Sequence, residues 1–454
     1  MTVEHYLDRF EQLAANGSSG AGGAGGNGRP AQPAWLEPLR REALGRFSAA
    51  GFPTTRVEDW KFTSVAAIAR QEFALLAEPA SGPEPEEFAG FLVGPAAAHR
   101  LVFVNGHYRA ELSSIGTLPD GVRLTNLATA WNDPALAAHL SRETDSAATA
   151  PGGSSLTDLN TAFMSDGVVL QVPAGATLER PVEALFLTDV RSDPAAGASH
   201  PRSLYLLEAG ARATVIETYA ALGDAGYFTN AVTEASLAAG SRLEHYKLQR
   251  ESEQAYHVGT FEAHQEAKSE LVSLSFAIGA ALSRSNVYTV LDGDGAHATM
   301  NGLYVVHGSQ HVDHQTRIEH AQPNCTSHEV YKGILDGESH GVFNGKVYVQ
   351  PIAQGTDGKQ TNQNLLMSPT AQVDTKPQLE IYADDVRCTH GATVGQLDPL
   401  AVFYCKSRGL DEAQARTLLT YGFAADVLEQ IPSRAVADHL ERLVMRRFLG
   451  TGAA

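Results

Sequence analysis

The residues best suited to metal or redox chemistry in this sequence lie in one short stretch, DDVRCTHG, from Asp384 to Gly391. Residues two apart in an extended strand point to the same face, so Cys388 and His390 can present a thiol and an imidazole together. Both groups bind iron, copper or zinc, and a cysteine beside a cationic imidazole is also a reactive nucleophile. Spacing alone favours a structural role for the pair, with Cys388 as a small buried hydrophobe and His390 as a hydrogen-bonded strand residue. Two ligands do not complete a metal site, so other segments or another chain would have to supply the rest.

Histidines are concentrated in a second stretch, where seven of the seventeen lie between positions 297 and 340. These are His297, His307, His311, His314, His320, His328 and His340. In an extended strand His311 and Asp313 share a face and His314 points to the other. We consider these three residues as a secondary metal site, because imidazoles and carboxylates both bind metal ions. The favoured alternative is a ladder of hydrogen-bonded polar side chains, since no HExxH or paired CxxC pattern fixes a site.

Composition excludes several functional classes. The 454 residues carry 34 basic and 52 acidic side chains, a net charge of −18, which disfavours binding to nucleic acids or to anionic lipid surfaces. No apolar run approaches the ~18 residues of a membrane helix, and the acidic N-terminus does not resemble a signal peptide. Three widely spaced cysteines argue against a disulfide scaffold. We therefore expect a cytoplasmic protein.

Enzymatic signatures are also missing. The sequence contains neither the GxxxxGK[ST] motif of P-loop ATPases nor the GxSxG motif of hydrolases. Asp384 and Asp385 suggest a carbohydrate-active enzyme, but adjacent strand residues point to opposite faces and cannot act together on one bond. A stand-alone carbohydrate-active enzyme nevertheless stays open as an alternative.

The chain divides into three parts by pattern. Residues 1–155 are mostly helical and include a glycine-rich linker at 16–33. Residues 156–397 consist of short alternating runs rich in Val, Thr, Tyr and Ile, without intervening helices. Residues 398–454 return to helical periodicity, with Asp398, Asp411 and Ser433 as N-caps of three helices.

The middle part contains weak repeats. Similar units surround Gly175, Gly210 and Gly240, and a second pair of similar segments begins at Leu291 and Leu335, 44 residues apart. Repeats of tens of residues in strand-forming sequence favour stacked turns of a β-solenoid over a β-sandwich. Three short C-terminal helices cannot bury all of their apolar side chains among themselves, so we expect them to dock on the β unit or on a partner.

Several motifs together resemble the SufB/SufD family of iron–sulfur cluster assembly proteins. RVEDWKFTS (Arg56 to Ser64) is similar to the N-terminal signature of that family, and residues 159–186 are similar to the entry to its β-helical core. Residues 314–368 and 374–423 carry the longest resemblance, and HGATVGQLD followed by FYCKSRGL is closer to the SufD branch than to the SufB branch.

The resemblance implies a mainly β fold, a right-handed parallel β-helix between an N-terminal helical region and a C-terminal helical domain. It implies a non-catalytic scaffold subunit that pairs with SufB and binds the ABC-type ATPase SufC. Nascent clusters would form at the SufB–SufD interface, where Cys388 and His390 match the Cys-x-His pair of the family. The chain itself would hold no tight cofactor, only a transient iron–sulfur cluster or iron shared with SufB.

Two further expectations concern association. An apolar face with Leu410, Leu418, Leu419 and Phe423 is expected to dock SufC. The isolated chain is a candidate homodimer, and a metal-storage or chaperone protein that uses the histidine-rich strands is the third hypothesis.

Overall fold

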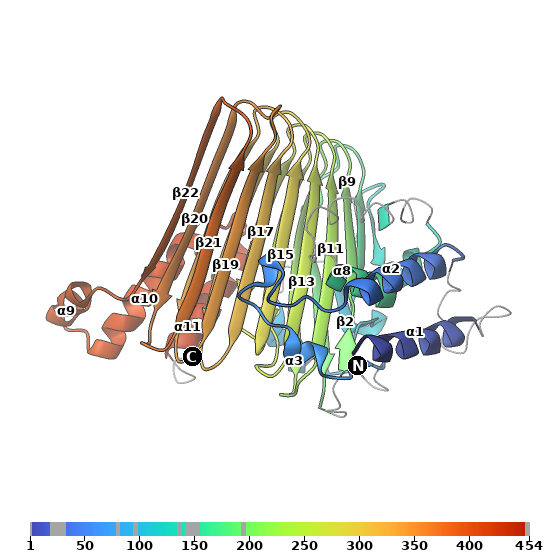
Figure 1. The fold of residues 1–454 in the computed structure, drawn as a ribbon, viewed down its shortest axis with the longest axis horizontal. Helices are drawn as coiled ribbons and strands as arrows, with labels where there is room; N and C mark the ends of the chain where they lie inside the picture. The colour runs from blue at the N-terminus through green and yellow to red at the C-terminus, as the bar shows by residue number, and fades with distance from the viewer. Residues whose placement is uncertain are drawn as a thin grey trace.

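The computed structural model describes residues 2–18, 33–78, 82–93, 99–133, 136, 139–140, 155–191 and 197–449. The predicted β-solenoid is confirmed, as a parallel β-solenoid of about seven turns with helical regions at both ends (Figure 1). Two sheets of parallel strands face each other, and each turn of the chain contributes one strand to each sheet. This topology excludes the β-sandwich, which is built from antiparallel strands.

The first sheet, sheet A, contains nine strands in one continuous ladder. Its strands are β5 (Arg123–Asn126), β6 (Val168–Val172), β9 (Arg202–Leu207), β11 (Phe228–Leu237), β13 (Tyr256–Gln265), β15 (Leu282–Leu291), β17 (His311–His320), β19 (His340–Val349) and β21 (Gln372–Ile381). The short strands β1 (Ala74–Leu75) and β8 (Gly197–Ser199) extend the same sheet beside β11.

The second sheet, sheet B, is built in the same way. Its strands are β2 (His99–Val104), β7 (Val182–Asp189), β10 (Arg212–Leu222), β12 (Arg242–Arg250), β14 (Glu270–Ala277), β16 (His297–Val306), β18 (Thr326–Leu335), β20 (Thr356–Leu366) and β22 (Val386–Gly395). The short strands β3 (His107–Tyr108) and β4 (Ser114–Ile115) pair antiparallel with β2.

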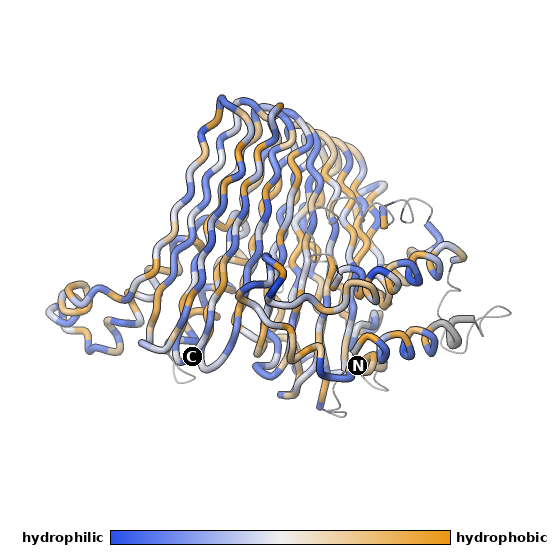
Figure 2. Tube along the Cα trace, in the orientation of Figure 1, coloured by the Kyte–Doolittle hydropathy of each residue, from blue (hydrophilic) through white to orange (hydrophobic). Residues whose placement is uncertain are grey.

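Hydrophobic and hydrophilic residues alternate along the strands, as expected for a sheet with one face in the core (Figure 2). The inward-facing side chains of both sheets form the largest core cluster, which runs from Leu101 to Cys325. A second cluster joins the outer face of sheet B to the C-terminal helices, and a third joins the outer face of sheet A to the N-terminal helices.

The turn glycines explain the first repeat found in the sequence. Gly175, Gly210 and Gly240 all have φ near +70°, which residues with a Cβ rarely adopt. The N–H of each donates to the next turn of the stack, Gly175 to Ala209 and Gly210 to Ala239. The repeat therefore marks stacked turns.

The second repeat has a different meaning. Register partners one turn apart are separated by 27 residues at Glu270 and His297 and by 31 at Thr326 and Asp357. A spacing of 44 residues is thus about one and a half turns. Leu291 ends a strand of sheet A and Leu335 ends a strand of sheet B, so the repeated segments are equivalent turn–strand units on opposite sheets.

The helices lie at the two ends and on the outer faces. They are α1 (Thr2–Ser18), α2 (Leu36–Ala50), α3 (Ala66–Ala69), α4 (Pro85–Phe88), α5 (Leu127–Ala130), α8 (Ser155–Phe163), α9 (Pro399–Ser407), α10 (Glu412–Leu428) and α11 (Arg434–Leu449). Residues 19–32 of the predicted linker lie outside the described residues. None of the helices in the described ranges is both long and apolar enough to cross a lipid bilayer.

The two ends of the solenoid differ. At the first turn, strands β2 and β5 of the N-terminal region extend both sheets and cover the end. At the last turn, β22 pairs with β20 on one side only, and β21 pairs with β19 on one side only. Within the described chain the last turn therefore presents two open strand edges.

Candidate functional site at the open end of the solenoid

Cys388 and His390 lie on β22, the last strand of sheet B, and they share its inward face as predicted. In the parallel register Cys388 is the partner of Gly358 and His390 is the partner of Gln360 on β20. His390 is exposed, because no further turn covers it, whereas Cys388 is half-buried. The structure thus places a free imidazole on an unpaired strand edge.

The cysteine has a less accessible setting. Cys388 packs against the apolar group that includes Val347 and Ala383, and burial raises the pKa of its thiol above the usual range. A thiol binds a metal best after it loses its proton, so partial burial disfavours the metal-binding form of Cys388. The two residues thus differ in accessibility although they share a face.

The predicted secondary metal site is not assembled. His311 and Asp313 lie on the outer face of β17, where Thr63 contacts both, through His311 Nε2 at 2.9 Å and Asp313 Oδ2 at 2.6 Å. His314 points into the solenoid, where its Nε2 lies 3.1 Å from Ser275 Oγ. In the described part of the chain, no three His, Cys, Asp or Glu side chains are grouped to hold a metal ion.

The histidines of this stretch are instead hydrogen-bonded, and His297 and His340 bond to the next strand of their own sheet, as the ladder interpretation expects. Six of its seven histidines have a hydrogen bond to a side chain, namely His297, His307, His311, His314, His320 and His340. Burial lowers the pKa of His314 to about 3 and that of His311 to about 4, so both are neutral at physiological pH. The carbohydrate hypothesis gains no support either, because Asp384 and Asp385 lie in the exposed turn before β22.

The N-terminal signature has a structural role that the sequence did not reveal. Residues 56–64 cross the outer face of sheet A, and the buried Trp60 lies under the guanidinium of Arg284, 3.6 Å from its ring centroid. Arg284 Nη1 also donates to Asp59 O at 2.7 Å and to Asp313 Oδ2 at 2.6 Å. The segment therefore holds consecutive turns of sheet A together.

The C-terminal helices begin at the predicted caps. Asp398 Oδ1 accepts from the N–H of Leu400 at 2.9 Å, and Asp411 and Gln414 form a capping box at the start of α10. Helix α9 projects away from the solenoid, and α10 and α11 pack on the outer face of sheet B (Figure 1).

The predicted docking residues do not form one exposed face. Leu418 is exposed, Leu410 and Leu419 are half-buried, and Phe423 packs against the solenoid with Lys332 Nζ 4.5 Å from its ring. The most exposed apolar side chains of this region lie on α9 and were missed in the sequence: they are Leu400, Phe403 and Tyr404. Residue type alone does not show whether such an apolar run is buried or exposed.

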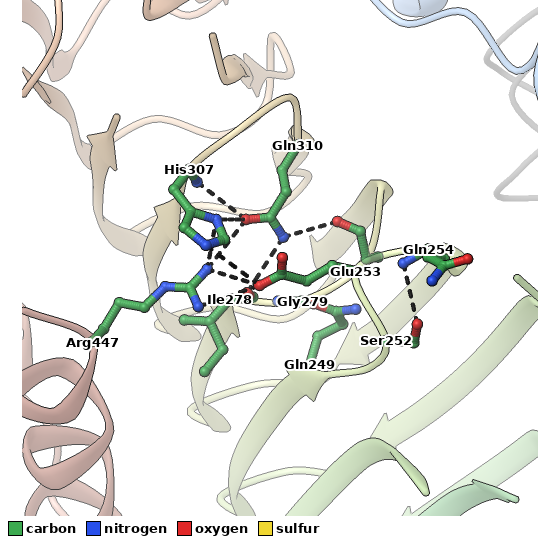
Figure 3. A network of polar contacts seen from close by, with 10 residues as sticks. Gln249, Ser252, Glu253, Gln254, Ile278, Gly279, His307, Gln310 and Arg447 are labelled. Atoms are coloured by element: carbon green, nitrogen blue, oxygen red, sulfur yellow. Dashed lines mark hydrogen bonds and ion pairs between the residues drawn. The ribbon is translucent and has the colours of Figure 1, made fainter. Parts of the chain in front are cut away.

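Polar contacts fix α11 to the rim of the solenoid. Arg447 Nη2 lies 3.2 Å from Glu253 Oε1 and 2.8 Å from His307 Nδ1, and Gln310 Oε1 lies beside them (Figure 3). On α10, Asp426 accepts from Lys332 Nζ at 2.5 Å. A force applied to these helices would therefore reach the strands of sheet B.

Comparison with known proteins agrees with this architecture. The model of the SufBD core domain, described as SUF-system iron–sulfur cluster assembly, matches residues 190–423, and the model of the SufBD N-terminal region matches residues 30–184. An iron–sulfur cluster assembly SufBD family protein of Synechocystis is 33% identical over 90% of both chains. The iron–sulfur cluster assembly protein SufD of Escherichia coli is 30% identical over 91% of this chain and 93% of its own, and SufD of Bacillus subtilis is 25% identical over 91% and 94%.

These matches and the open-ended solenoid define the class: the chain belongs to the SufB/SufD family of iron–sulfur cluster assembly proteins. Within that family it is most like SufD.

Proposed function

We propose that this chain is a non-catalytic scaffold subunit that pairs with SufB, so that nascent iron–sulfur clusters form where the two subunits meet. The observation that carries the proposal is the position of His390, which is an exposed imidazole on the unpaired edge strand β22. A second chain that adds a strand to this edge would bring its own side chains next to His390. The cluster is the cargo of this interface, and SufB supplies the remaining ligands.

The C-terminal helices are the proposed contact with the ATPase SufC. The exposed side chains of Leu400 and Phe403 on α9 and of Leu418 on α10 offer apolar area, and α10 is itself anchored to sheet B. Because α10 and α11 are tied to the strands by Lys332 and Arg447, movement of SufC would be transmitted to the solenoid. ATP-driven dimerisation of SufC could in this way open the SufB interface to iron, sulfide or electrons.

Purification of the chain from its native host with its partners and its metal intact tests the proposal. We expect SufB and SufC to co-purify in fixed proportions, and we expect iron and sulfide to accumulate only when ATP is supplied. The chain alone is expected to bind no iron stoichiometrically. A monomer that loads iron without partners, or that cleaves an acidic polysaccharide, would contradict the scaffold role.

A further inference from the structure

A column of three side chains leads from the interior of the solenoid to the candidate site. Glu329 on β18, Gln360 on β20 and His390 on β22 are consecutive partners in the parallel register. Side chains at matched positions of parallel strands stand one above the other on the same face. Glu329 is 0% exposed and Gln360 1% exposed, whereas His390 is exposed. The column thus ends at the imidazole.

The first contact of the column fixes the Gln360 amide. Gln360 Nε2 donates to Glu329 Oε2 at 2.7 Å, on the preceding turn. The facing strand provides the space for this side chain, because a Cβ on Gly345 would collide with the Gln360 amide. The hydrogen bond to Glu329 therefore orients the amide nitrogen toward that carboxyl group, in the space that Gly345 leaves.

The carbonyl oxygen of the Gln360 amide lacks a hydrogen bond within the described chain. Gln360 Oε1 is shielded from solvent and has no hydrogen-bond partner among the described residues. A buried carbonyl oxygen without a donor costs stability, so a nearby N–H would gain by bonding to it. The next position of the column belongs to His390, whose exposed ring is free to turn toward it.

We infer that Gln360, held by Glu329, is a positioning residue for His390, and that its Oε1 accepts the imidazole N–H once SufB covers the end of the solenoid. This inference rests on the proposed function. An acceptor on one ring nitrogen fixes the tautomer, so the other nitrogen keeps its lone pair for iron. The isolated chain then carries a half-formed site that the partner completes.

Co²⁺ is the probe for this inference, used on the complete complex with SufB and SufC after its metal has been removed. Binding is followed by the visible absorption of Co²⁺, and the part that depends on His390 is defined by the His390→Ala complex. Loss of an outer hydrogen-bond partner typically weakens metal affinity about 10- to 100-fold.

The main variant is Glu329→Leu/Gln360→Leu, which replaces both polar partners by apolar side chains of similar size and so keeps the fold. We expect its melting temperature to be no lower than that of the wild type and its His390-dependent Co²⁺ affinity to fall about 10- to 100-fold. The exchanged variant Glu329→Gln/Gln360→Glu retains both the internal hydrogen bond and the acceptor, and we expect it to bind Co²⁺ close to wild-type strength.

Two results would overturn the positioning role: unchanged affinity in the Leu/Leu variant, or equally weak binding in the exchanged variant. A wild-type complex whose Co²⁺ binding is the same as that of His390→Ala would instead contradict the ligand role of His390, and the positioning role would fall with it. The two failures are therefore distinguishable.

Discussion

The guanidinium of Arg284 lies over the indole of Trp60, with its carbon 3.6 Å from the ring centroid. The two residues are far apart in the sequence, one in the N-terminal signature and the other on β15. Both are almost completely buried, so the contact combines cation–π attraction with apolar packing. It explains why a tryptophan is part of the motif: it attaches the N-terminal region to sheet A.

Removal of this indole should destabilise the protein. We expect Trp60→Ala to lower the free energy of unfolding by roughly 3–5 kcal/mol, because it leaves a cavity and exposes a buried guanidinium. Thermal or urea unfolding measures the loss. The matched control is Lys61→Ala, an exposed neighbour in the same motif, for which the change should stay within ~0.5 kcal/mol. Equal effects of the two substitutions would contradict the anchoring role.

The ion pair below this contact gives a second stability prediction. Arg284 and Asp313 are 1% and 0% exposed, and their side chains lie 2.6 Å apart. Asp313→Ala should cost roughly 3–5 kcal/mol, because the buried Arg284 loses its counter-charge. Arg284→Met/Asp313→Leu should recover most of that loss, since it removes both charges together. Denaturant unfolding of the wild type, Asp313→Ala and the double variant measures both changes. A double variant as unstable as Asp313→Ala would contradict the loss of the counter-charge as the cause.

The candidate site predicts that loss of His390 reduces cluster formation more than loss of Cys388. We expect His390→Ala to leave the melting temperature and the assembly of the complex unchanged, because the side chain is exposed, and to abolish cluster formation. Cys388→Ala should have the smaller effect on cluster yield, because partial burial raises the pKa of the thiol and disfavours its metal-binding form at neutral pH. Cluster yield is measured in cells that depend on this system, beside the melting curve. A destabilised His390→Ala protein would indicate a structural histidine instead.

The C-terminal helices give a prediction about partner binding. Phe403→Glu and Leu418→Glu change side chains that are 70% and 51% exposed, so we expect a folded protein that no longer binds SufC. Phe423→Glu is the contrasting variant, because this ring packs against the solenoid below Lys332 and its loss should lower stability. Pull-down of SufC together with circular dichroism separates the two classes. Full SufC binding by both Phe403→Glu and Leu418→Glu would rule out this surface as the SufC contact.

Glu329 gives a prediction about pH. Burial raises the pKa of its carboxyl to about 7, above the ordinary value of 4.5, so the folded protein favours the protonated form. Between pH 4.5 and 7 the folded state therefore holds more protons than the unfolded state, and the contribution of Glu329 to stability falls as pH rises. We expect Glu329→Gln, which cannot ionise, to gain stability relative to the wild type across this range, by roughly 3 kcal/mol at pH 8. Melting temperatures of both proteins at pH 5 and pH 8 provide the test. A difference in melting temperature between the two proteins that is the same at both pH values would refute the prediction.

Local features of this protein were determined by the sequence itself. Turn glycines such as Gly175 and Gly210, which have positive φ, mark the turns, and Asp398 and Asp411 begin helices as their side chains predict. The shared face of Cys388 and His390 follows from strand alternation alone. The turn glycines, the helix caps and the shared strand face each depend only on residues within a few positions. The backbone geometry that produces them does not depend on what the segment packs against.

Relationships between turns were decided by the tertiary structure. The parallel register places Gln360 below His390, and the number of residues in each turn sets that register. The same stacking sends His314 into the interior while His311 is covered by Thr63 from the N-terminal region. Exposure is also non-local. Phe423 is half-buried and Phe403 is exposed because only the helix of Phe423 packs on sheet B. That packing joins distant segments, and the periodicity of neither helix predicts it.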